Sequence, residues 1–262
     1  MSKSIITLTT DFGLADHFVG TMKGVILGLA PEAQVVDISH EVRPFDIAQG
    51  GFLMAQAWKF FPPGTVHVVV VDPGVGTSRR PILAEAAGHR FVAPDNGVLS
   101  MVYSSEKHTV RAITAEKYFL QPVSRTFHGR DIFAPVAAHL ARGARPASFG
   151  KRIEDYLRRD FERPVRTGKR AWTGAVLHID HFGNLITNYR LEEFPQLRER
   201  RFVLAAGFQA IERLVGTYGE GERGELVLIE GSSGFLEISL DQAPAAKILG
   251  CGVGAPLELT IY

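Results

Sequence analysis

The feature that most constrains this chain is a run of β-branched residues that stops at an acid. Residues 66–71 read Val-His-Val-Val-Val-Val, which is typical of a strand buried on both faces, as in the middle of a parallel sheet. A proline and two glycines follow Asp72, so the chain must leave the sheet in a tight loop, with Arg79 and Arg80 on its far side. Ligands of open α/β sheets bind at the carboxyl ends of central strands, which makes Asp72 the first candidate for chemistry.

The sequence around this run predicts strands and helices in alternation. Residues 5–9 and 34–39 have strand patterns. Apolar residues recur at helical spacing after Asp16, which we interpret as a helix N-cap, and again over residues 45–60. Later elements are expected as strands at residues 82–86, 90–93 and 109–113 and as helical segments that end near Tyr103 and Leu140. This order predicts an α/β domain with a mainly parallel sheet and helices on its faces.

Strand patterns replace helical ones after the basic, irregular residues 142–170. They lie at residues 172–179, 202–205, 226–229, 235–240 and 256–262, with a polar, hairpin-like turn over 216–224. We interpret the basic residues as solvated surface and linker rather than as a binding patch. The predicted organisation is an N-terminal α/β domain over residues 1–163, a linker over 164–171, and a smaller all-β domain over 172–262.

Composition narrows the classes of partner and compartment. The 262 residues are 45% hydrophobic and 22% charged, and the formal net charge of +1 gives no electrostatic reason to expect binding to nucleic acid or to an anionic membrane. The N-terminal residues turn polar too soon for a signal peptide, and no apolar run approaches the length of a membrane span. The single cysteine, Cys251, excludes an internal disulfide framework and a multi-cysteine metal site. We therefore expect a soluble cytoplasmic protein.

Four titratable residues at expected strand-to-loop junctions of the first domain are candidates for a site: Asp11, Asp16, Asp72 and His128. Each alone is usually a turn former or a helix cap, but together they predict a polar cleft along one sheet edge. A carboxylate beside a histidine and an arginine can orient and deprotonate a water molecule. A metal-dependent phosphoesterase that also uses Asp131 is an alternative, although the sequence offers no closely spaced histidine pair to hold two ions.

Two further polar clusters lie in the second part of the chain. Residues 180–184 read Asp-His-Phe-Gly-Asn, which suits a hairpin turn. They equally suit a planar heterocycle with a cationic tail, its ring stacked on Phe182 and its edge bonded by the amide of Asn184. Residues 231–234 read Gly-Ser-Ser-Gly, and their hydroxyls and amides either bind a carboxylate or cap a turn. The residues themselves leave these alternatives open.

The clusters occur together in an order that resembles one enzyme family. The motifs are Thr9-Thr10-Asp11-Phe12-Gly13 with Asp16, Asp72-Pro73-Gly74-Val75-Gly76-Thr77 with Arg79-Arg80, Thr126-Phe127-His128-Gly129-Arg130-Asp131, Asp180-His181-Phe182-Gly183-Asn184, and Ser232-Ser233-Gly234. They resemble the S-adenosyl-L-methionine (SAM) hydrolases, also called SAM hydroxide adenosyltransferases, which are related to the fluorinase and chlorinase enzymes. The resemblance covers essentially the whole chain. It implies an N-terminal α/β domain, a C-terminal β domain, and a homotrimer with active sites between the N-terminal domain of one subunit and the C-terminal domain of the next.

The resemblance also implies roles for individual residues. Asp72, Arg79 and His128 match the family's water-activating triad. The matches around the substrate are Asp11 at the ribose hydroxyls, Asp16 and Asp180 at the methionine amine, Asn184 at the adenine edge, Phe182 at the adenine ring, and Ser232 with Ser233 at the methionine carboxylate. Phe45, which is also assigned to substrate binding, stands where the halogenating relatives carry a tryptophan, and Asp72 stands where they carry a tyrosine. The loop that those relatives insert after this region is missing.

The expected activity is hydrolysis of SAM to adenosine and L-methionine by in-line attack of water or hydroxide on C5′ of the ribose, without a metal or organic cofactor. Asp72 disfavours a halogenase, and a non-catalytic sensor of adenosine or SAM is the other alternative. The sequence leaves open whether Asp72 or His128 takes the proton, or whether hydroxide binds directly beside Arg79. The arginine is expected to lower the pKa of Asp72.

Overall fold

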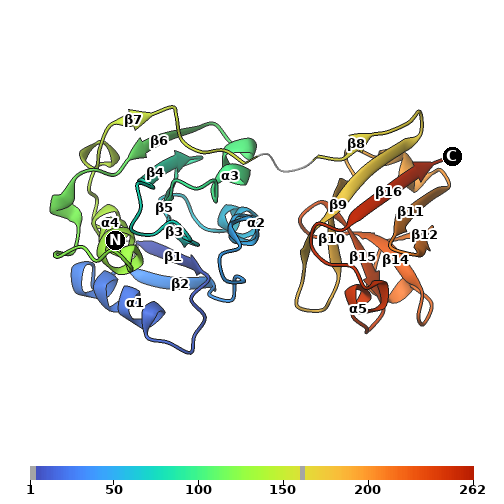
Figure 1. The fold of residues 1–262 in the computed structure, drawn as a ribbon, viewed down its shortest axis with the longest axis horizontal. Coiled ribbons are helices and arrows are strands. Elements are labelled where there is room, and N and C mark those ends of the chain that lie inside the picture. The colour runs from blue at the N-terminus through green and yellow to red at the C-terminus, as the bar shows by residue number, and fades with distance from the viewer. Residues whose placement is uncertain (1–3, 160–162) are drawn as a thin grey trace. The chain divides into compact units, whose positions relative to one another are not determined.

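Two compact units make up the protein, whose computed structural model describes residues 4–159 and 163–262 (Figure 1). Contacts divide the chain into unit 1, residues 1–161, and unit 2, residues 162–262. Each unit has its own hydrophobic core. Within the described ranges, every helix falls short of the length and apolarity of a transmembrane span.

Unit 1 is built on a seven-stranded sheet with the order β2-β1-β3-β5-β4-β6-β7. The strands are β1 (Ile5–Thr10), β2 (Gln34–Ser39), β3 (Val66–Val70), β4 (Pro81–Ala86), β5 (His89–Pro94), β6 (His108–Ala112) and β7 (Arg152–Ile153). Strands β2, β1, β3 and β5 run parallel, whereas β4, β6 and β7 join the sheet by antiparallel pairing. The sheet is therefore partly parallel, not mainly parallel as predicted.

The short connection between β4 and β5 explains this difference. Only Ala87 and Gly88 separate the two strands, and both have positive φ, 47° and 81°. Such a two-residue turn joins neighbouring antiparallel strands, because a parallel crossover needs a dozen or more residues.

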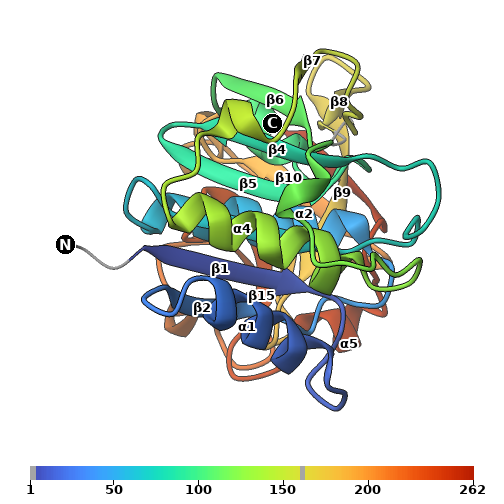
Figure 2. The same ribbon diagram turned by 90° about the vertical axis from the view of Figure 1, so that its left-hand side faces the viewer.

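Helices cover both faces of the unit 1 sheet. They are α1 (Phe18–Leu29) and α4 (Ala134–Ala141) on one face, and α2 (Ile47–Ala57) and α3 (Ser100–Ser105) on the other. Figure 2 shows α1 and α4 on the side of the sheet that faces the viewer. Successive valines of β3 divide between the two cores, with Val68 toward α1 and α4 and Val69 toward α2 and α3. All residues of β3 are buried, which confirms the prediction of a strand buried on both faces.

Short helical turns complete unit 1. They are the 3₁₀ turns η1 (Trp58–Phe60), η2 (Glu116–Tyr118) and η4 (Pro146–Ser148), and the π-helical turn η3 (Gly129–Phe133), which leads directly into α4.

Two helices start later than predicted. The first helical hydrogen bond of α1 runs from the N–H of Thr21 to the carbonyl of His17, so the N-cap is His17 and the prediction of Asp16 as N-cap is wrong. Helix α2 begins at Ile47 because Asp46 caps it, accepting a hydrogen bond of 2.9 Å from the N–H of Gln49.

Unit 2 contains a nine-stranded sheet with the order β12-β11-β16-β9-β10-β15-β14-β13, and β8 pairs with β9. The strands are β8 (Val165–Arg166), β9 (Ala171–Ile179), β10 (Leu185–Arg190), β11 (Phe202–Ala206), β12 (Gln209–Ile211), β13 (Leu214–Val215), β14 (Leu226–Glu230), β15 (Phe235–Leu240) and β16 (Pro256–Ile261). The helical elements are α5 (Ala245–Leu249) and the 3₁₀ turns η5 (Pro195–Arg198) and η6 (Tyr218–Glu220).

Two local features of unit 2 differ from the sequence pattern. Strand β8 lies within residues 164–171, the range predicted as linker, and pairs with β9. Strands β13 and β14 pair in parallel, so residues 216–224 between them do not form the predicted hairpin turn.

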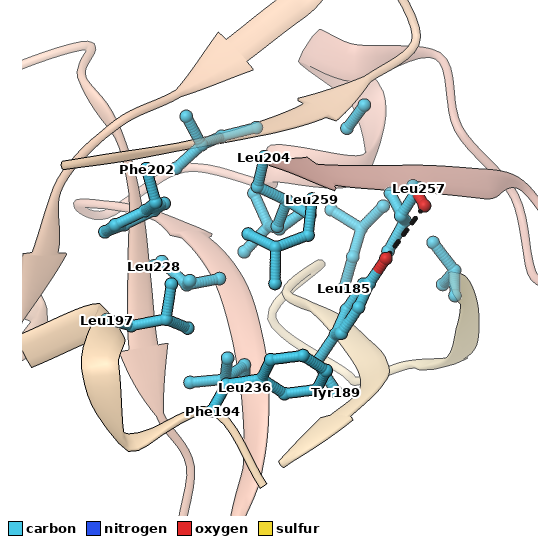
Figure 3. Close-up of a cluster of buried hydrophobic side chains, with 14 of the residues drawn as sticks. Leu185, Tyr189, Phe194, Leu197, Phe202, Leu204, Leu228, Leu236, Leu257 and Leu259 are labelled. Atoms are coloured by element: carbon cyan, nitrogen blue, oxygen red, sulfur yellow. Dashed lines mark hydrogen bonds between the residues drawn. The ribbon is translucent and has the colours of Figure 1, made fainter. Parts of the chain in front are cut away.

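Tyr189 connects three strands in the core of unit 2. Its side chain is fully buried, and its hydroxyl lies 3.0 Å from the carbonyl oxygens of both Trp172 in β9 and Leu257 in β16. Figure 3 shows the contact with Leu257 among the surrounding leucine and phenylalanine side chains. A buried hydroxyl needs such partners, so Tyr189 aligns the strands that flank the polar cluster at residues 180–184.

Candidate active site

Two acidic residues follow neighbouring strands at the same end of the unit 1 sheet. Strands β1 and β3 pair in parallel with Thr10 opposite Val70, so Asp11 and Asp72 lie just beyond the carboxyl ends of neighbouring strands. His128 was predicted at a strand-to-loop junction. It instead occupies the N-cap of η3 and does not follow a strand.

Asp72, Arg79 and His128 form one connected group. Nε of Arg79 donates to Oδ1 of Asp72 at 3.0 Å, and Nη2 donates to Oδ2 of Asp72 and to Nδ1 of His128, the latter at 3.1 Å. The side chains of Arg79 and Asp72 are only 6% and 5% exposed. Both carboxylate oxygens accept from the guanidinium, which is a strong and directional arrangement. The loop between β3 and β4 thus brings the three predicted catalytic residues into contact.

The contact with Arg79 defines the protonation of His128. A guanidinium only donates hydrogen bonds, so Nδ1 of His128 must accept and carries no proton. The imidazole is then neutral, with its proton on Nε2. Burial and the neighbouring Arg79 cation lower the pKa of His128, which favours this neutral form.

Burial decides the direction of the pKa shift at Asp72. Desolvation raises the pKa of Asp72 above its ordinary value, although Arg79 and His128 act in the opposite direction. Arg79 acts in the expected direction, but burial outweighs it because the carboxyl is almost enclosed, so the net shift of the Asp72 pKa is upward. A raised pKa makes Asp72 a stronger base than an exposed aspartate.

One donor of Arg79 has no partner. Nη1 is buried and makes no hydrogen bond with the described residues, and the guanidinium lies over the ring of Phe133, 5.4 Å from the ring centroid. Leaving a buried donor unpaired costs about 1–3 kcal/mol. A ligand oxygen or a water that bonds to Nη1 is therefore stabilised.

Arg80, the next residue, serves another part of unit 1. Its guanidinium pairs with Asp95 at 2.7 Å and with Asp155 at 3.0 Å. Asp95 also accepts a hydrogen bond of 2.7 Å from the N–H of Leu157. These contacts fasten residues 155–157 to the sheet and leave Arg80 outside the Asp72 group.

Asp11 contacts the loop that precedes α2. Its Oδ2 accepts a hydrogen bond of 2.8 Å from the N–H of Phe45, whose side chain is 70% exposed. Burial raises the pKa of Asp11, and the hydrogen bond from Phe45 acts in the opposite direction. Asp11 and Phe45, both predicted to bind substrate, are therefore neighbours. Asp16 is exposed, and its side chain makes no hydrogen bond or ion pair with the described residues.

Aromatic side chains pack the Asp11 loop against the His128 loop. The rings of Phe12 and Phe127 meet edge-on, with 5.9 Å between centroids, and Phe18 lies 5.1 Å from Phe127 in the same way. Phe12 and Phe127 are the immediate neighbours of Asp11 and His128 in the chain. This cluster places the two loops side by side.

Asp131 has a structural role. It is fully buried, and it accepts hydrogen bonds from Nε of Arg130 at 2.6 Å and from the N–H of Ser124 at 2.8 Å. The metal-dependent alternative required Asp131 as a ligand, but both of its oxygens are already bonded. Across residues 4–159 and 163–262, no group of three or more His, Cys, Asp or Glu side chains is arranged to hold a metal ion.

In unit 2, Asp180 organises the turn between β9 and β10. Its Oδ1 accepts from the N–H groups of Phe182 and Asn184, and its Oδ2 accepts from Nδ2 of Asn184, all at 2.9 Å. The backbone thus forms the hairpin that was one interpretation of residues 180–184. The same contacts fix the amide of Asn184 and leave the Phe182 ring 75% exposed.

A pocket of about 540 Å³ lies beside this turn. Its lining residues are Asp180, Phe182, Asn184, Tyr218, Leu240, Asp241, Gln242, Ala243 and Pro244. Tyr218 donates from its hydroxyl to Oε2 of Glu237 at 3.0 Å, and burial together with this carboxylate raises the pKa of Tyr218 to about 12. Aromatic and apolar walls with a few fixed polar groups suit a small planar ligand.

Ser232 and Ser233 lie in the turn between β14 and β15 and do not line this pocket. Strands β10 and β15 pair with Leu185 opposite Ile238 and Arg190 opposite Phe235. The serine turn is therefore at the far end of this strand pair from Asn184. Unit 2 by itself does not bring the serines and Asn184 together.

Comparisons with known proteins assign both parts of the chain to one family. The family model for the SAM hydroxide adenosyltransferase N-terminal domain matches residues 6–150, and the model for the corresponding C-terminal domain matches residues 174–258. The chain belongs to the SAM hydroxide adenosyltransferase family. The resemblance seen in the sequence motifs is thereby confirmed.

The relatives of this chain include proteins named SAM hydrolase and proteins named fluorinase. An (R)-S-adenosyl-L-methionine hydrolase of Salinispora tropica is 40% identical over 97% of each chain. A fluorinase of Actinoplanes sp. strain N902-109 is 26% identical over 98% of this chain and 97% of its own. The crystal structure of an uncharacterized conserved protein from Thermotoga maritima superposes with a TM-score of 0.91 at 37% identity, covering 98% of this chain and 99% of that one.

The pocket of unit 2 includes residues that the sequence analysis missed. Tyr218 lies in the polar stretch interpreted as a turn, where a lone aromatic was the only signal available. Residues 240–244 have no recognisable motif, and the positive φ of Gln242, 52°, is visible only in the structure.

Proposed function

We propose that this protein hydrolyses SAM to adenosine and L-methionine, with water or hydroxide attacking C5′ of the ribose. The observation that carries the proposal is the buried Asp72–Arg79–His128 group. It combines a carboxyl of raised pKa, a neutral imidazole and an unpartnered guanidinium donor. Such a group can hold a water oxygen and take its proton. The relatives named SAM hydrolase support the same reaction.

The chemistry of SAM matches a site of this kind. A bond forms between the attacking oxygen and C5′ while the bond from C5′ to sulfur breaks, and its electron pair leaves with the sulfur. Methionine departs with a neutral thioether, so the leaving group needs no general acid. What the reaction needs is a nucleophile held in line behind C5′.

Asp72 is the proton acceptor that the contacts favour. The lone pair on Nδ1 of His128 is taken by Arg79, so the neutral imidazole can donate from Nε2 but cannot accept a proton without losing that contact. Arg79 and the backbone N–H of Gly74 take three of the four lone pairs of the Asp72 carboxylate, so one lone pair is left for the proton of the nucleophile. The imidazole also hydrogen-bonds the backbone of Ser124, which fixes its orientation. In this mechanism Arg79 holds the nucleophile, His128 positions Arg79, and Asp72 takes the proton.

Asp11 is assigned to the ribose hydroxyls. Only its Oδ2 is bonded to Phe45, so the carboxylate can accept further hydrogen bonds from the two hydroxyls of a ribose. The exposed Phe45 ring then packs beside the substrate, and Asp16 is assigned to the methionine ammonium group.

The pocket of unit 2 is assigned to adenine. Asn184 bonds the edge of the base and Phe182 packs on its ring, while Asp180 fixes both and faces the methionine amine. Ser232 and Ser233 are assigned to the methionine carboxylate.

The proposed assembly is a homotrimer with an active site between unit 1 of one subunit and unit 2 of the next. Phe45 and Leu14 on unit 1 and Phe182 on unit 2 are apolar side chains with 70%, 67% and 75% of their surface exposed, close to the proposed substrate residues. The functional domains are an α/β domain, residues 1–163, and an all-β domain, residues 172–262, joined by residues 164–171. We assign the reaction to the cytoplasm, with no cofactor.

The test is incubation of the purified protein with SAM in a chloride-containing buffer with EDTA, with products separated by chromatography and identified by mass. Adenosine and methionine are expected. Formation of 5′-chloro-5′-deoxyadenosine would show that chloride is the nucleophile. If SAM is retained on the protein without turnover, the protein is a sensor and not a hydrolase.

A further inference from the structure

A second chain of polar side chains lies next to the proposed site and has no role in the mechanism above. Thr10 Oγ1 lies 2.8 Å from Nδ1 of His40, Nε2 of His40 lies 3.0 Å from Oδ1 of Asp37, and Lys23 Nζ lies 2.5 Å from Oδ2 of Asp37. The sequence analysis singled out neither Asp37 nor His40. Carboxylate, imidazole and hydroxyl follow one another as in the triads of nucleophilic enzymes.

Burial excludes a nucleophilic role for this group. Thr10 is fully buried and His40 is 4% exposed, so no substrate reaches the hydroxyl. The short contact between His40 and Asp37 is poorly aligned for a hydrogen bond, and its attraction is therefore mainly electrostatic. Burial raises the pKa of Asp37, but the hydrogen bond from Lys23 and the attraction of Lys23 and His40 outweigh it and leave this pKa lowered, so the carboxylate is charged.

The group holds together the two loops that meet at Asp11. The Thr10 hydroxyl also accepts a hydrogen bond of 3.3 Å from the N–H of Phe12, on the other side of Asp11. The carbonyl of His40 accepts from the N–H of Gly13 at 2.8 Å. Each loop therefore contacts the other on both sides of Asp11, and Phe45, the partner of the Asp11 carboxylate, lies on the His40 loop.

We infer that Asp37 and His40 are positioning residues, which act through the Thr10 hydroxyl to hold the Asp11 carboxylate in the orientation that binds ribose. This inference rests on the proposed function, since Asp11 is assigned to the ribose there. A hydroxyl shared between Phe12 and His40 restricts rotation of the peptide units on both sides of Asp11. The carboxylate is then aimed before the substrate arrives, which lowers the ordering cost of binding.

Thr10 offers a matched pair of variants. Thr10→Val keeps the shape and removes the hydroxyl, whereas Thr10→Ser keeps the hydroxyl. We expect Thr10→Val to weaken adenosine binding by a factor of about 3 to 10, as for loss of one hydrogen bond, and to raise KM for SAM with little change in kcat. Thr10→Ser should restore the wild-type values. Asp37→Asn, at a more exposed position of the chain, should weaken adenosine binding in the same direction even if Thr10→Val does not fold.

A double-mutant cycle with Asp11→Ala separates positioning from general structural support. Adenosine affinities are measured by calorimetry for wild type, Thr10→Val, Asp11→Ala and the double variant. If Thr10 acts through Asp11, Thr10→Val has no further effect once Asp11 is alanine. An equal effect in both backgrounds would overturn the inference, as would wild-type affinity in both Thr10→Val and Asp37→Asn. Unchanged affinity in Asp11→Ala alone would instead refute the ribose assignment in the proposed function.

Discussion

Nη2 of Arg79 lies 3.1 Å from Nδ1 of His128, and this contact couples the protonation of the imidazole to the position of the guanidinium. Arg79 can only donate, so a proton on Nδ1 would set two donors against each other and place a second cation beside the first. The neutral state of His128 is therefore a condition for the intact Asp72–Arg79–His128 group.

The pH dependence of kcat/KM should show this condition. The pKa of His128 is lowered, so protonation of the imidazole begins only below its ordinary value of 6.5, and activity is lost as the pH falls through the lowered pKa. Asp72 must be deprotonated as well, so the slope of log(kcat/KM) against pH should approach about two on the acid side. His128→Asn, whose Oδ1 can accept from Arg79, should reduce this slope to about one. An unchanged slope in this variant would show that His128 does not titrate in the free enzyme. Circular dichroism at each pH is the control for unfolding.

Replacement of Asp72 should separate binding from turnover. Asp72→Asn keeps one acceptor for Arg79 but loses the base, so kcat for SAM hydrolysis should fall by about 10²–10⁴ while SAM affinity is kept. Asp72→Ala should also lose hydrolysis and keep binding, but it leaves Arg79 buried without its partner and should reduce the free energy of unfolding by about 3–5 kcal/mol. Rapid-quench kinetics, calorimetry and thermal denaturation measure the three quantities. Equal losses of affinity and turnover would remove Asp72 from the chemical step.

Asn184 should contribute to adenosine affinity without affecting the chemical step. Asn184→Ala removes one hydrogen bond to the base, and we expect adenosine to bind about 3- to 10-fold more weakly. The control is His181→Ala, because His181 lies in the same turn, is exposed, and does not line the pocket. If calorimetry gives wild-type affinity for Asn184→Ala, the adenine site lies elsewhere.

Local patterns in the sequence predicted the elements that carry the site. The β-branched run before Asp72 gave a strand buried on both faces, and the acids that follow β1 and β3 lie at one sheet edge because parallel neighbours end together. The parallel character of the sheet was overestimated, because a two-residue turn at Ala87 reverses the chain. A turn of that length is a stronger constraint on strand direction than the alternation of strands and helices before it.

The sequence patterns did not show which side chains are buried by residues distant in the chain. Arg79 follows Asp72 closely, so their pairing was predictable, but the extent of enclosure was not, and enclosure sets the pKa direction of Asp72. His40 and Thr10 are 30 positions apart in the chain and share a buried hydrogen bond. No local sequence pattern predicts such a contact. Tyr218 lines the pocket only because the folded unit brings it near Asn184.

Mixing inactive subunits tests the proposed assembly. In a homotrimer whose sites combine unit 1 of one subunit with unit 2 of the next, Asp72→Ala and Asn184→Ala damage opposite sides of a site. When the two variants are unfolded together and refolded as an equal mixture, about a quarter of the sites should combine an intact unit 1 with an intact unit 2. Hydrolysis measured under conditions where each variant alone is deficient should then rise toward about a quarter of the wild-type rate. Wild-type protein refolded alone is the control for recovery. Activity no greater than the average of the two separate variants would show that each site is built within one chain, and sedimentation of the same samples would report whether trimers had formed.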